Sequence, residues 1–324
     1  MKLIISFIGN VIGKKGVGMI LSVSRRTDIP NYYMEWFLER LKAEEVCVKN
    51  PWNPHQVSKI PLRKEDIDCI VFWTKHPRGL IQHLDELHTN MFYVQFTLTG
   101  YGKDIEPCLP DKRKVLIPQF LYLAEKIGKE RMVWRYDPIM INSRYTVEYH
   151  IKAFEQIANA LDGATNRVVI SFIDLYRKMK NREDKKEPFR EVTKEEINTL
   201  CAEFVQVARK HHMTVMTCSE DISLDHLGII HGCCIDKAMI EELVGYELKT
   251  VKDSNQRTSC GCIQSIDIGR YDTCPNGCIY CYATETKSHV EHQRNQYDIH
   301  SEILCDAISI SDKVTIRKVS SLKK

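Results

Sequence analysis

Short apolar runs rich in β-branched and aromatic residues recur along the chain, and amphipathic stretches separate most of them. Such runs are typical of buried strands, whereas apolar residues that recur every three or four positions indicate helices. Strand and helix therefore alternate, which predicts parallel βα units. The six principal runs are Met19–Val23, Ile67–Trp73, Met91–Leu98, Arg131–Trp134, Arg167–Phe172 and Met213–Thr217.

Three helices can be placed from their ends. The segment Thr193-Lys-Glu-Glu196 has the pattern of a capping box, in which the threonine and glutamate side chains satisfy free backbone amides. The apolar residues that follow keep helical spacing and place Cys201 toward the core. A second helix follows Thr146 and stops at Gly163, and a third ends at Gly128.

A short late strand, Ser265–Ile268, leads directly into a cysteine-rich loop. Six βα units and this strand predict an α/β fold, an open or closed (β/α) barrel of the TIM type, which we favour over a Rossmann sheet. The predicted barrel domain covers residues 19–285, with a cluster-binding loop at about 260–285. Residues 286–324 are expected to form a helical extension.

The first 18 residues resemble a short signal peptide, but Gly13-Lys-Lys-Gly16 is no cleavage site. We interpret residues 1–18 as a dispensable extension, with Met19 as an alternative natural start. No segment approaches the roughly 18 continuous apolar residues of a membrane helix. Thirteen cysteines without an export signal indicate the reducing cytoplasm, where metal binding is more common than disulfides.

The formal net charge of +3 gives weak attraction for polyanions. A dedicated nucleic-acid-binding protein carries a clustered basic face, which this composition does not indicate. Charge therefore does not identify the partner.

The segment Cys274-Pro-Asn-Gly-Cys278-Ile-Tyr-Cys281 leaves gaps of three and then two residues between its cysteines. Zinc is the main alternative for paired cysteines, but it usually needs a fourth ligand downstream. The candidates there lie in a segment with a helical pattern: His289, His292, His300 and Cys305. Three thiolates instead suit an iron–sulfur cluster with one iron left open.

This spacing, with Tyr280 directly before the last cysteine, resembles the signature of radical S-adenosylmethionine enzymes. The resemblance implies that Cys274, Cys278 and Cys281 hold a [4Fe-4S] cluster. It further implies that the open iron binds S-adenosylmethionine, with Tyr280 beside the adenine. In that superfamily the motif normally lies near the start of the barrel, whereas here it lies near the C-terminus.

More of the chain, about residues 19 to 285, resembles an uncharacterised bacterial family of unknown function that also carries its cysteine motif late. The resemblance rests on five sequence segments: Ser22–Pro30, Phe72–Lys75, Arg135–Pro138, Cys260–Cys262 and Asp267–Tyr271. A circular permutation explains the late motif, because the strand before the cysteines would then pair with the N-terminal strand.

Under that permutation the loop Ser24–Asp28 lies next to the cluster. Related barrels place an acidic residue there against the amine of S-adenosylmethionine, and the resemblance assigns this role to Asp28. The alternative is that Asp28 caps a helix that begins near Pro30. The two roles are compatible.

Polar residues follow the apolar runs, and strand ends converge on one mouth in a parallel barrel. Four cations, Arg25, Arg26, Lys75 and Arg135, form a candidate site for a phosphate or carboxylate, including that of the cofactor. The alternative is internal ion pairing, with Asp137 as the partner of Arg135. The other polar endings are Thr74, Thr97, Thr99, Asp174, Tyr176, Ser219 and Glu220.

A second group of cysteines lies in the last third of the chain. We expect Cys218, Cys234, Cys260 and Cys262 to bind a second iron–sulfur cluster or a zinc ion, with buried free thiols as the alternative. Cys233 is left out because adjacent side chains seldom point at one site. The remaining cysteines Cys47, Cys69, Cys108 and Cys305 are interpreted as structural.

Two loops have a structural and a functional interpretation. The segment Asn50–His55, which contains Trp52 and two prolines, is either a structural hairpin, which we favour, or a cover over the mouth. The charged run Arg177–Glu187 is interpreted as a solvated loop, with a lid over an anionic substrate as the alternative.

The leading hypothesis is an enzyme that reductively cleaves S-adenosylmethionine to start radical chemistry, acting as a lyase, transferase or oxidoreductase. It predicts a small or anionic substrate and an electron donor such as flavodoxin or ferredoxin. A non-catalytic iron–sulfur or zinc protein is the second hypothesis. The third is nucleic-acid repair or modification, because Gly277–Tyr282 resembles spore photoproduct lyase.

Overall fold

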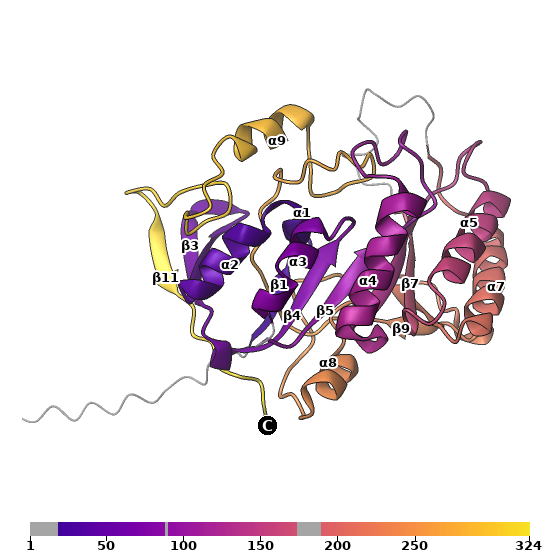
Figure 1. Ribbon diagram of the computed structural model, residues 1–324, viewed down its shortest axis with the longest axis horizontal. Helices are drawn as coiled ribbons and strands as arrows, with labels where there is room; N and C mark the ends of the chain where they lie inside the picture. Colours follow the sequence, from indigo (N-terminus) through magenta and orange to yellow (C-terminus); the bar gives the residue numbers. More distant parts are fainter. Residues whose placement is uncertain (1–18, 88–89, 174–188) are drawn as a thin grey trace, which may run out of the picture.

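Eight parallel strands form the main sheet of this protein, described here from a computed structural model (Figure 1). The structure describes residues 19–87, 90–173 and 189–324. The strand order is β10-β1-β4-β5-β6-β7-β8-β9. The strands are β1 (Met19–Val23), β4 (Ile67–Thr74), β5 (Phe92–Thr97), β6 (Met132–Ile139), β7 (Arg167–Phe172), β8 (Thr214–Cys218), β9 (Ile230–Gly232) and β10 (Ile266–Asp267).

The strands predicted from the apolar runs are confirmed to within a few residues, and the α/β class with them. The late strand β10 pairs in parallel with β1, with Leu21 opposite Ile266, so the expected neighbour relation holds. Strand β9 was not predicted, because three residues are too few to show an alternation of apolar and polar side chains. β10 and β9 are the two edges, and no pairing in the described residues joins them, so the sheet is open.

Helices follow most of the strands, and their predicted ends are confirmed except at Gly163, because α5 already ends at Ala160. Thr193 caps α7 with both halves of the capping box, Thr146 caps α5, and Gly128 ends α4. The helices are α1 (Ile29–Tyr32), α2 (Met34–Lys42), α3 (Arg78–Gln82), α4 (Ile117–Ile127), α5 (Val147–Ala160), α7 (Lys194–Lys210), α8 (Lys237–Val244) and α9 (Lys287–Arg294). A π-helical turn, Lys112–Leu116, precedes α4, and 3₁₀ turns cover Lys64–Asp66, Leu84–Leu87, Lys129–Arg131 and Asp225–Leu227.

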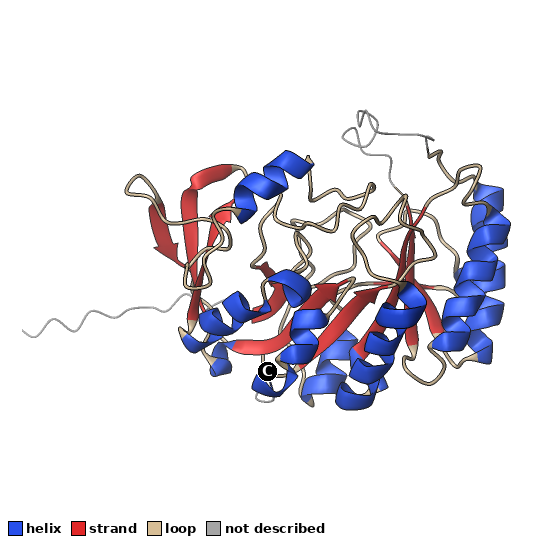
Figure 2. Cartoon of the chain, turned by 45° about the horizontal axis from the view of Figure 1, so that its top comes forward, coloured by secondary structure: helices blue, strands red, loops and turns tan. Residues whose placement is uncertain are grey.

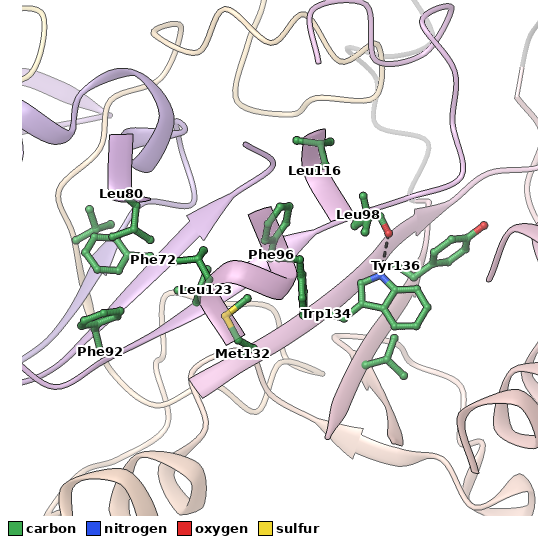
Figure 3. Packing of buried hydrophobic residues seen from close by; sticks show 14 of the residues in the cluster. Phe72, Leu80, Phe92, Phe96, Leu98, Leu116, Leu123, Met132, Trp134 and Tyr136 are labelled. Carbon is green, nitrogen blue, oxygen red and sulfur yellow. Dashed lines mark hydrogen bonds between the residues drawn. The ribbon is translucent and has the colours of Figure 1, made fainter. Parts of the chain in front are cut away.

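One face of the sheet packs against α1–α5 and α7 and forms the larger core. Trp134 is fully buried there, stacks on Phe154 with ring centroids 4.7 Å apart, and donates from Nε1 to the Leu98 carbonyl at 2.8 Å (Figure 3). Cys201 of α7 also faces this core, as predicted. Successive residues of a strand point to opposite faces, so the neighbours of these residues form a second surface.

The second face carries a separate cluster that includes Ile20, Val71, Tyr93 and Val133. The segment 234–263, with α8, packs against this cluster and covers this face of the sheet. The interior of this fold is therefore occupied by a later segment of the chain, and several cysteines lie in that segment.

A three-stranded sheet, β11-β3-β2, stands at one end of the molecule (Figure 2). Its strands are β2 (Glu45–Asn50), β3 (Asn53–Pro61) and β11 (Lys313–Ile316). The loop between β2 and β3 carries Trp52, which is 95% exposed, and His55 contacts Asp312 at 3.1 Å. The structural hairpin predicted for this segment is confirmed.

The prediction that residues 286–324 form a helical extension is wrong for most of the segment. It contains α9, and then β11, which pairs in parallel with β3. The edge of β3 offers unpaired amide and carbonyl groups, which attract a further strand whatever its helical propensity. None of the helices in the described part of the chain has the length and apolar character needed to cross a bilayer.

His150 of α5 predicts a pH dependence of stability. The side chain is fully buried between the Tyr136 hydroxyl, 2.8 Å from Nδ1, and the Met140 carbonyl, 2.9 Å from Nε2. Burial lowers its pKa to about 4, although the bond to Met140 acts in the opposite direction. The folded protein therefore resists protonation that the unfolded chain accepts, and stability is lost as the pH falls from about 6.5 to about 4.

We expect this loss to be about 3 kcal/mol and to disappear in His150→Gln. Urea denaturation at pH 7 and pH 4.5 measures it as the difference between wild type and variant. The exposed histidine variant His226→Gln is the control. Equal pH dependence in all three proteins would contradict the assignment.

Candidate metal centre

A cavity of about 340 Å³ opens at the carboxyl ends of the parallel strands. Residues at the carboxyl ends of β4 to β8 and in the loop after β1 line it together with the cysteine loop 274–284. The sulfur-bearing residues Cys274, Cys278 and Cys281 all belong to this lining. The cavity lies where strand ends converge in a parallel sheet, and the late cysteine motif reaches it because β10 lies beside β1.

The cysteine loop is held by backbone contacts with the loop after β5. The Ile279 amide donates to the Ile105 carbonyl at 3.1 Å, and the Cys108 amide donates to the Asn276 carbonyl at 3.4 Å. Gly277 has φ +67°, and a Cβ there would lie 3.2 Å from Pro107. The turn between the first two cysteines therefore needs glycine.

Two of the three thiols, those of Cys274 and Cys278, lie in surroundings that disfavour free thiolates. Burial raises the pKa of Cys274 to about 12, and the Asp28 carboxylate adds to the effect. Burial also raises the pKa of Cys278, although the Lys75 ammonium opposes it. A metal ion binds thiolates and displaces the protons of the thiols. It would therefore stabilise the negative charge of thiolates, which burial in this pocket otherwise disfavours.

The spacing of the sulfur atoms is wider than one ion requires. The Sγ atoms of Cys274, Cys278 and Cys281 do not all lie within 4.8 Å of one another, whereas the thiolates of a tetrahedral zinc are about 3.8 Å apart. The downstream candidates for a fourth ligand have other partners. His289 contacts Glu285, His292 contacts Gln296, His300 lies near Glu39, and Cys305 contacts Tyr33.

Asp28 both caps α1 and lines the cavity. Its Oδ1 accepts from the Asn31 amide at 3.2 Å and from the Thr74 hydroxyl at 2.7 Å, and its Oδ2 accepts from the Lys75 amide at 2.9 Å and from Asn276 Nδ2 at 3.2 Å. Burial raises its pKa to about 6. The predicted cap is confirmed, and Asn276 ties the same carboxylate to the cysteine loop.

The loop Ser24–Asp28 lies next to the cysteine loop, as the predicted permutation requires. The Tyr282 hydroxyl donates to the Arg25 carbonyl at 2.7 Å. Arg26 donates to the Gly269 carbonyl at 3.2 Å and lies over the Tyr271 ring. Both arginines line the cavity, and the buried Nη2 of Arg25 has no hydrogen-bond partner within the described structure.

For two of the four predicted cations, the ion-pair interpretation is confirmed. Lys75 Nζ lies 3.1 Å from Glu106, and Arg135 pairs with Asp137, which also accepts from Ser171. Arg26 Nε makes a longer contact, 4.0 Å, with Asp267 Oδ1, and anion binding is left as the interpretation for Arg25. Tyr280 lines the cavity, and its hydroxyl accepts from Lys75 at 2.6 Å and donates to Glu106.

Glu106 is a central residue that sequence reasoning missed. It is 2% exposed and contacts Lys75, Lys112, Thr99 and Tyr280. It lies in an irregular loop with no motif, so no local signal identifies it. Asp267 and Asn276 were also missed, although Asp267 ends β10 and the strand-end rule selects it. Asp267 accepts from Ser22, Ser24 and the Arg25 amide.

The structure also brings the second cysteine group together. Cys218 Sγ and Cys234 Sγ are 2.8 Å apart, and the Cys262 thiol interacts with those of Cys234 and Cys260. Of the remaining cysteines, Cys47, Cys69 and Cys305 are buried and Cys108 is exposed. The predictions for Asp174, Tyr176 and the charged run Arg177–Glu187 fall outside the described residues.

One group of donor atoms within the described residues is compact enough for a single ion: Asp272, Glu285 and His289, all within 4.8 Å of one another. These side chains are half-buried or exposed, and exposed acidic groups commonly occur without a metal. They do not line the cavity.

Comparisons with known proteins give a family but no reaction. A family profile described as "Domain of unknown function (DUF1848)" matches residues 20–283. No curated protein matches. A crystal structure of a candidate alpha-L-fucosidase from Bacteroides thetaiotaomicron VPI-5482 is similar at 14% identity over 76% of this chain and 89% of that chain. Its TM-score is 0.29, and a superposition this loose carries no argument.

Proposed function

The chain belongs to the family described as a domain of unknown function, DUF1848. For this member we propose the function of a radical S-adenosylmethionine-type iron–sulfur enzyme. The observation that carries the proposal is the shared cavity. Cys274, Cys278 and Cys281 line it together with a buried carboxylate, Asp28, at the carboxyl ends of the strands.

The residues present fit a [4Fe-4S] cluster. Three thiols reach one cavity, their sulfurs are spread more widely than the ligands of one ion, and the nearby histidines have other partners. Cys274, Cys278 and Cys281 would hold the cluster. When bound and reduced, such a cluster supplies the electron that cleaves S-adenosylmethionine to a 5′-deoxyadenosyl radical.

Asp28 is the group we assign to the cofactor's amine. Four donors fix its carboxylate, and with a pKa of about 6 it is mostly ionised at neutral pH. A fixed carboxylate holds an ammonium group without reorganising. The hydrogen bond from Asn276 to this carboxylate fixes the cysteine loop relative to Asp28.

The cations of the cavity suit the anionic end of the cofactor or of a substrate. Arg25 and Arg26 enter the cavity from the loop after β1, and Arg25 has an unpartnered buried nitrogen. Tyr280 keeps its hydroxyl on Lys75 and Glu106, which fixes the ring at the cavity wall. An aromatic ring held in this way offers a face for adenine.

We extend the proposal to the fold. The open parallel sheet is a partial TIM-type barrel, circularly permuted relative to other radical S-adenosylmethionine enzymes. The pairing of β10 with β1 supports this permutation. β10 comes last in the sequence among the strands of the main sheet, yet it lies at the edge of the sheet next to β1, the first strand.

Electron paramagnetic resonance tests the proposal. The anaerobically reconstituted, dithionite-reduced protein is expected to give a [4Fe-4S]⁺ signal that changes when S-adenosylmethionine is added, because the open iron acquires new ligands. A signal indifferent to the cofactor would indicate a non-catalytic cluster. Zinc in place of iron in the cysteine loop would refute the proposal.

A further inference from the structure

Four thiols from three segments meet beneath the cavity. Cys218 ends β8, Cys234 precedes α8, and Cys260 and Cys262 follow it in a later loop. The contacts run in the order Cys218, Cys234, Cys262, Cys260. The 2.8 Å between the sulfurs of Cys218 and Cys234 is longer than a disulfide bond, which measures about 2.05 Å.

The backbone around these thiols is fixed by the sheet. The Cys234 carbonyl accepts from the Tyr93 hydroxyl at 2.6 Å and from Gln95 Nε2 at 2.8 Å, both on β5. The Ile235 amide donates to Cys262 Sγ at 3.4 Å, and the Ile263 amide donates to the Ile235 carbonyl at 3.1 Å. These bonds hold the two cysteine-bearing loops in register, so the arrangement is built into the fold.

Two guanidinium groups accompany the thiols. Arg135 Nη1 donates to Cys234 Sγ at 2.7 Å. The electrostatic neighbours of Arg25 include Cys262, Asp267 and Cys234, and its buried Nη2 has no hydrogen-bond partner in the described structure. A buried cation needs a compensating anion. Thiols supply one when they are bound to a metal as thiolates.

We propose that Cys218, Cys234, Cys260 and Cys262 bind a second metal, a single zinc ion, that is independent of the cysteine loop 274–281. Zinc with four thiolates carries a net charge of −2, and the guanidinium groups of Arg25 and Arg135 place positive charge beside it, although Arg135 also pairs with Asp137. The site borders the cavity through Cys218 and staples the segment 234–263 to the sheet.

We favour zinc over a second iron–sulfur cluster because each of these sulfurs contacts the next in the series, whereas the thiolates that bind a cluster lie further apart. A tetrahedral zinc keeps its thiolates about 3.8 Å apart. No three of the four sulfurs all lie within 4.8 Å of one another, so binding a single ion requires Cys218 and Cys260, the two ends of the series, to move toward the centre. Gly261 between the last two cysteines allows both to turn toward one ion.

Elemental analysis of the aerobically purified protein tests the site. We expect about one zinc per chain in the wild type. The Cys274→Ala/Cys278→Ala/Cys281→Ala variant should keep it, and the Cys260→Ser/Cys262→Ser variant should lose it. Cys233→Ser, which changes the neighbour of Cys234, is the matched control and should keep it. Zinc retained in Cys260→Ser/Cys262→Ser, or iron in place of zinc, would overturn the proposal.

X-ray absorption at the zinc edge of the wild-type protein covers the case in which Cys260→Ser/Cys262→Ser does not fold. Four sulfur neighbours at about 2.3 Å are expected. Nitrogen or oxygen ligands, or a wild-type protein without zinc, would refute the site. The proposed reaction is judged separately, because the triple cysteine variant tests that reaction while leaving this site intact.

Discussion

Replacing Cys278 with alanine is expected to abolish the cleavage of S-adenosylmethionine by the reduced, anaerobically reconstituted protein. Cys278 is the most buried of the three cysteines in the loop and lies beside Lys75. Its loss leaves two thiolates, which cannot hold a cluster with one open iron. We expect a decrease of more than about 100-fold, because even an outer partner of a metal ligand is worth about 10- to 100-fold.

The measurement is the amount of 5′-deoxyadenosine released with dithionite as the reductant, together with iron per chain. Cys108→Ser is the matched control, because Cys108 is exposed and its backbone contacts the same loop. The control should retain both iron and cleavage. Cleavage at the wild-type rate in Cys278→Ala would refute the assignment of the cluster, and zinc at the second site should be unchanged in both variants.

The second large effect is expected from Glu106→Gln, which should lower the free energy of unfolding by about 3–5 kcal/mol. Glu106 is 2% exposed and is shared by the ammonium groups of Lys75 and Lys112, at 3.1 and 2.6 Å. Removing its charge leaves two cations close together with no carboxylate between them. Glutamine keeps only one acceptor oxygen, so an amide nitrogen would face either the donors at Oε1, Lys75 and Tyr280, or those at Oε2, Lys112 and Thr99.

The same pair of cations gives this effect a pH dependence with a defined sign. Burial raises the pKa of Glu106, but Lys75 and Lys112 outweigh burial and lower it to about 2, from 4.5. The stabilisation is therefore present above about pH 4.5 and is lost as the pH falls toward 2. The difference in stability between wild type and Glu106→Gln should shrink between pH 6 and pH 3.

Urea denaturation at both pH values measures this difference. Glu291→Gln, which removes an exposed partner of Lys287 at 3.7 Å, is the control and should change stability by less than about 1 kcal/mol. An effect of Glu106→Gln no larger than that of the control would mean that the ion pairs contribute little. A difference that grows on acidification would contradict the assigned pKa.

Local signals in the sequence were sufficient for most strands of the main sheet, for several helix ends and for the choice of candidate cysteines. Strands such as β1 and β7 were predicted from apolar runs, and α5 and α7 from Thr146 and Thr193, because periodicity and capping depend on neighbours in the chain. The three cysteines in the loop 274–281 were found because their spacing is itself the signal. Strand-end position located Asp28, Lys75 and Arg135 at the cavity.

Tertiary structure decided which charges remain available and where distant segments meet. Glu106 has no motif, yet it neutralises Lys75 and Lys112 because the loop after β5 folds back over the cavity. Residues 313–316 became a strand because β3 had a free edge, an attraction that no local propensity encodes. Sequence alone thus determined the elements and the candidate ligands, whereas ion pairing and strand edges depend on contacts between residues far apart in the chain.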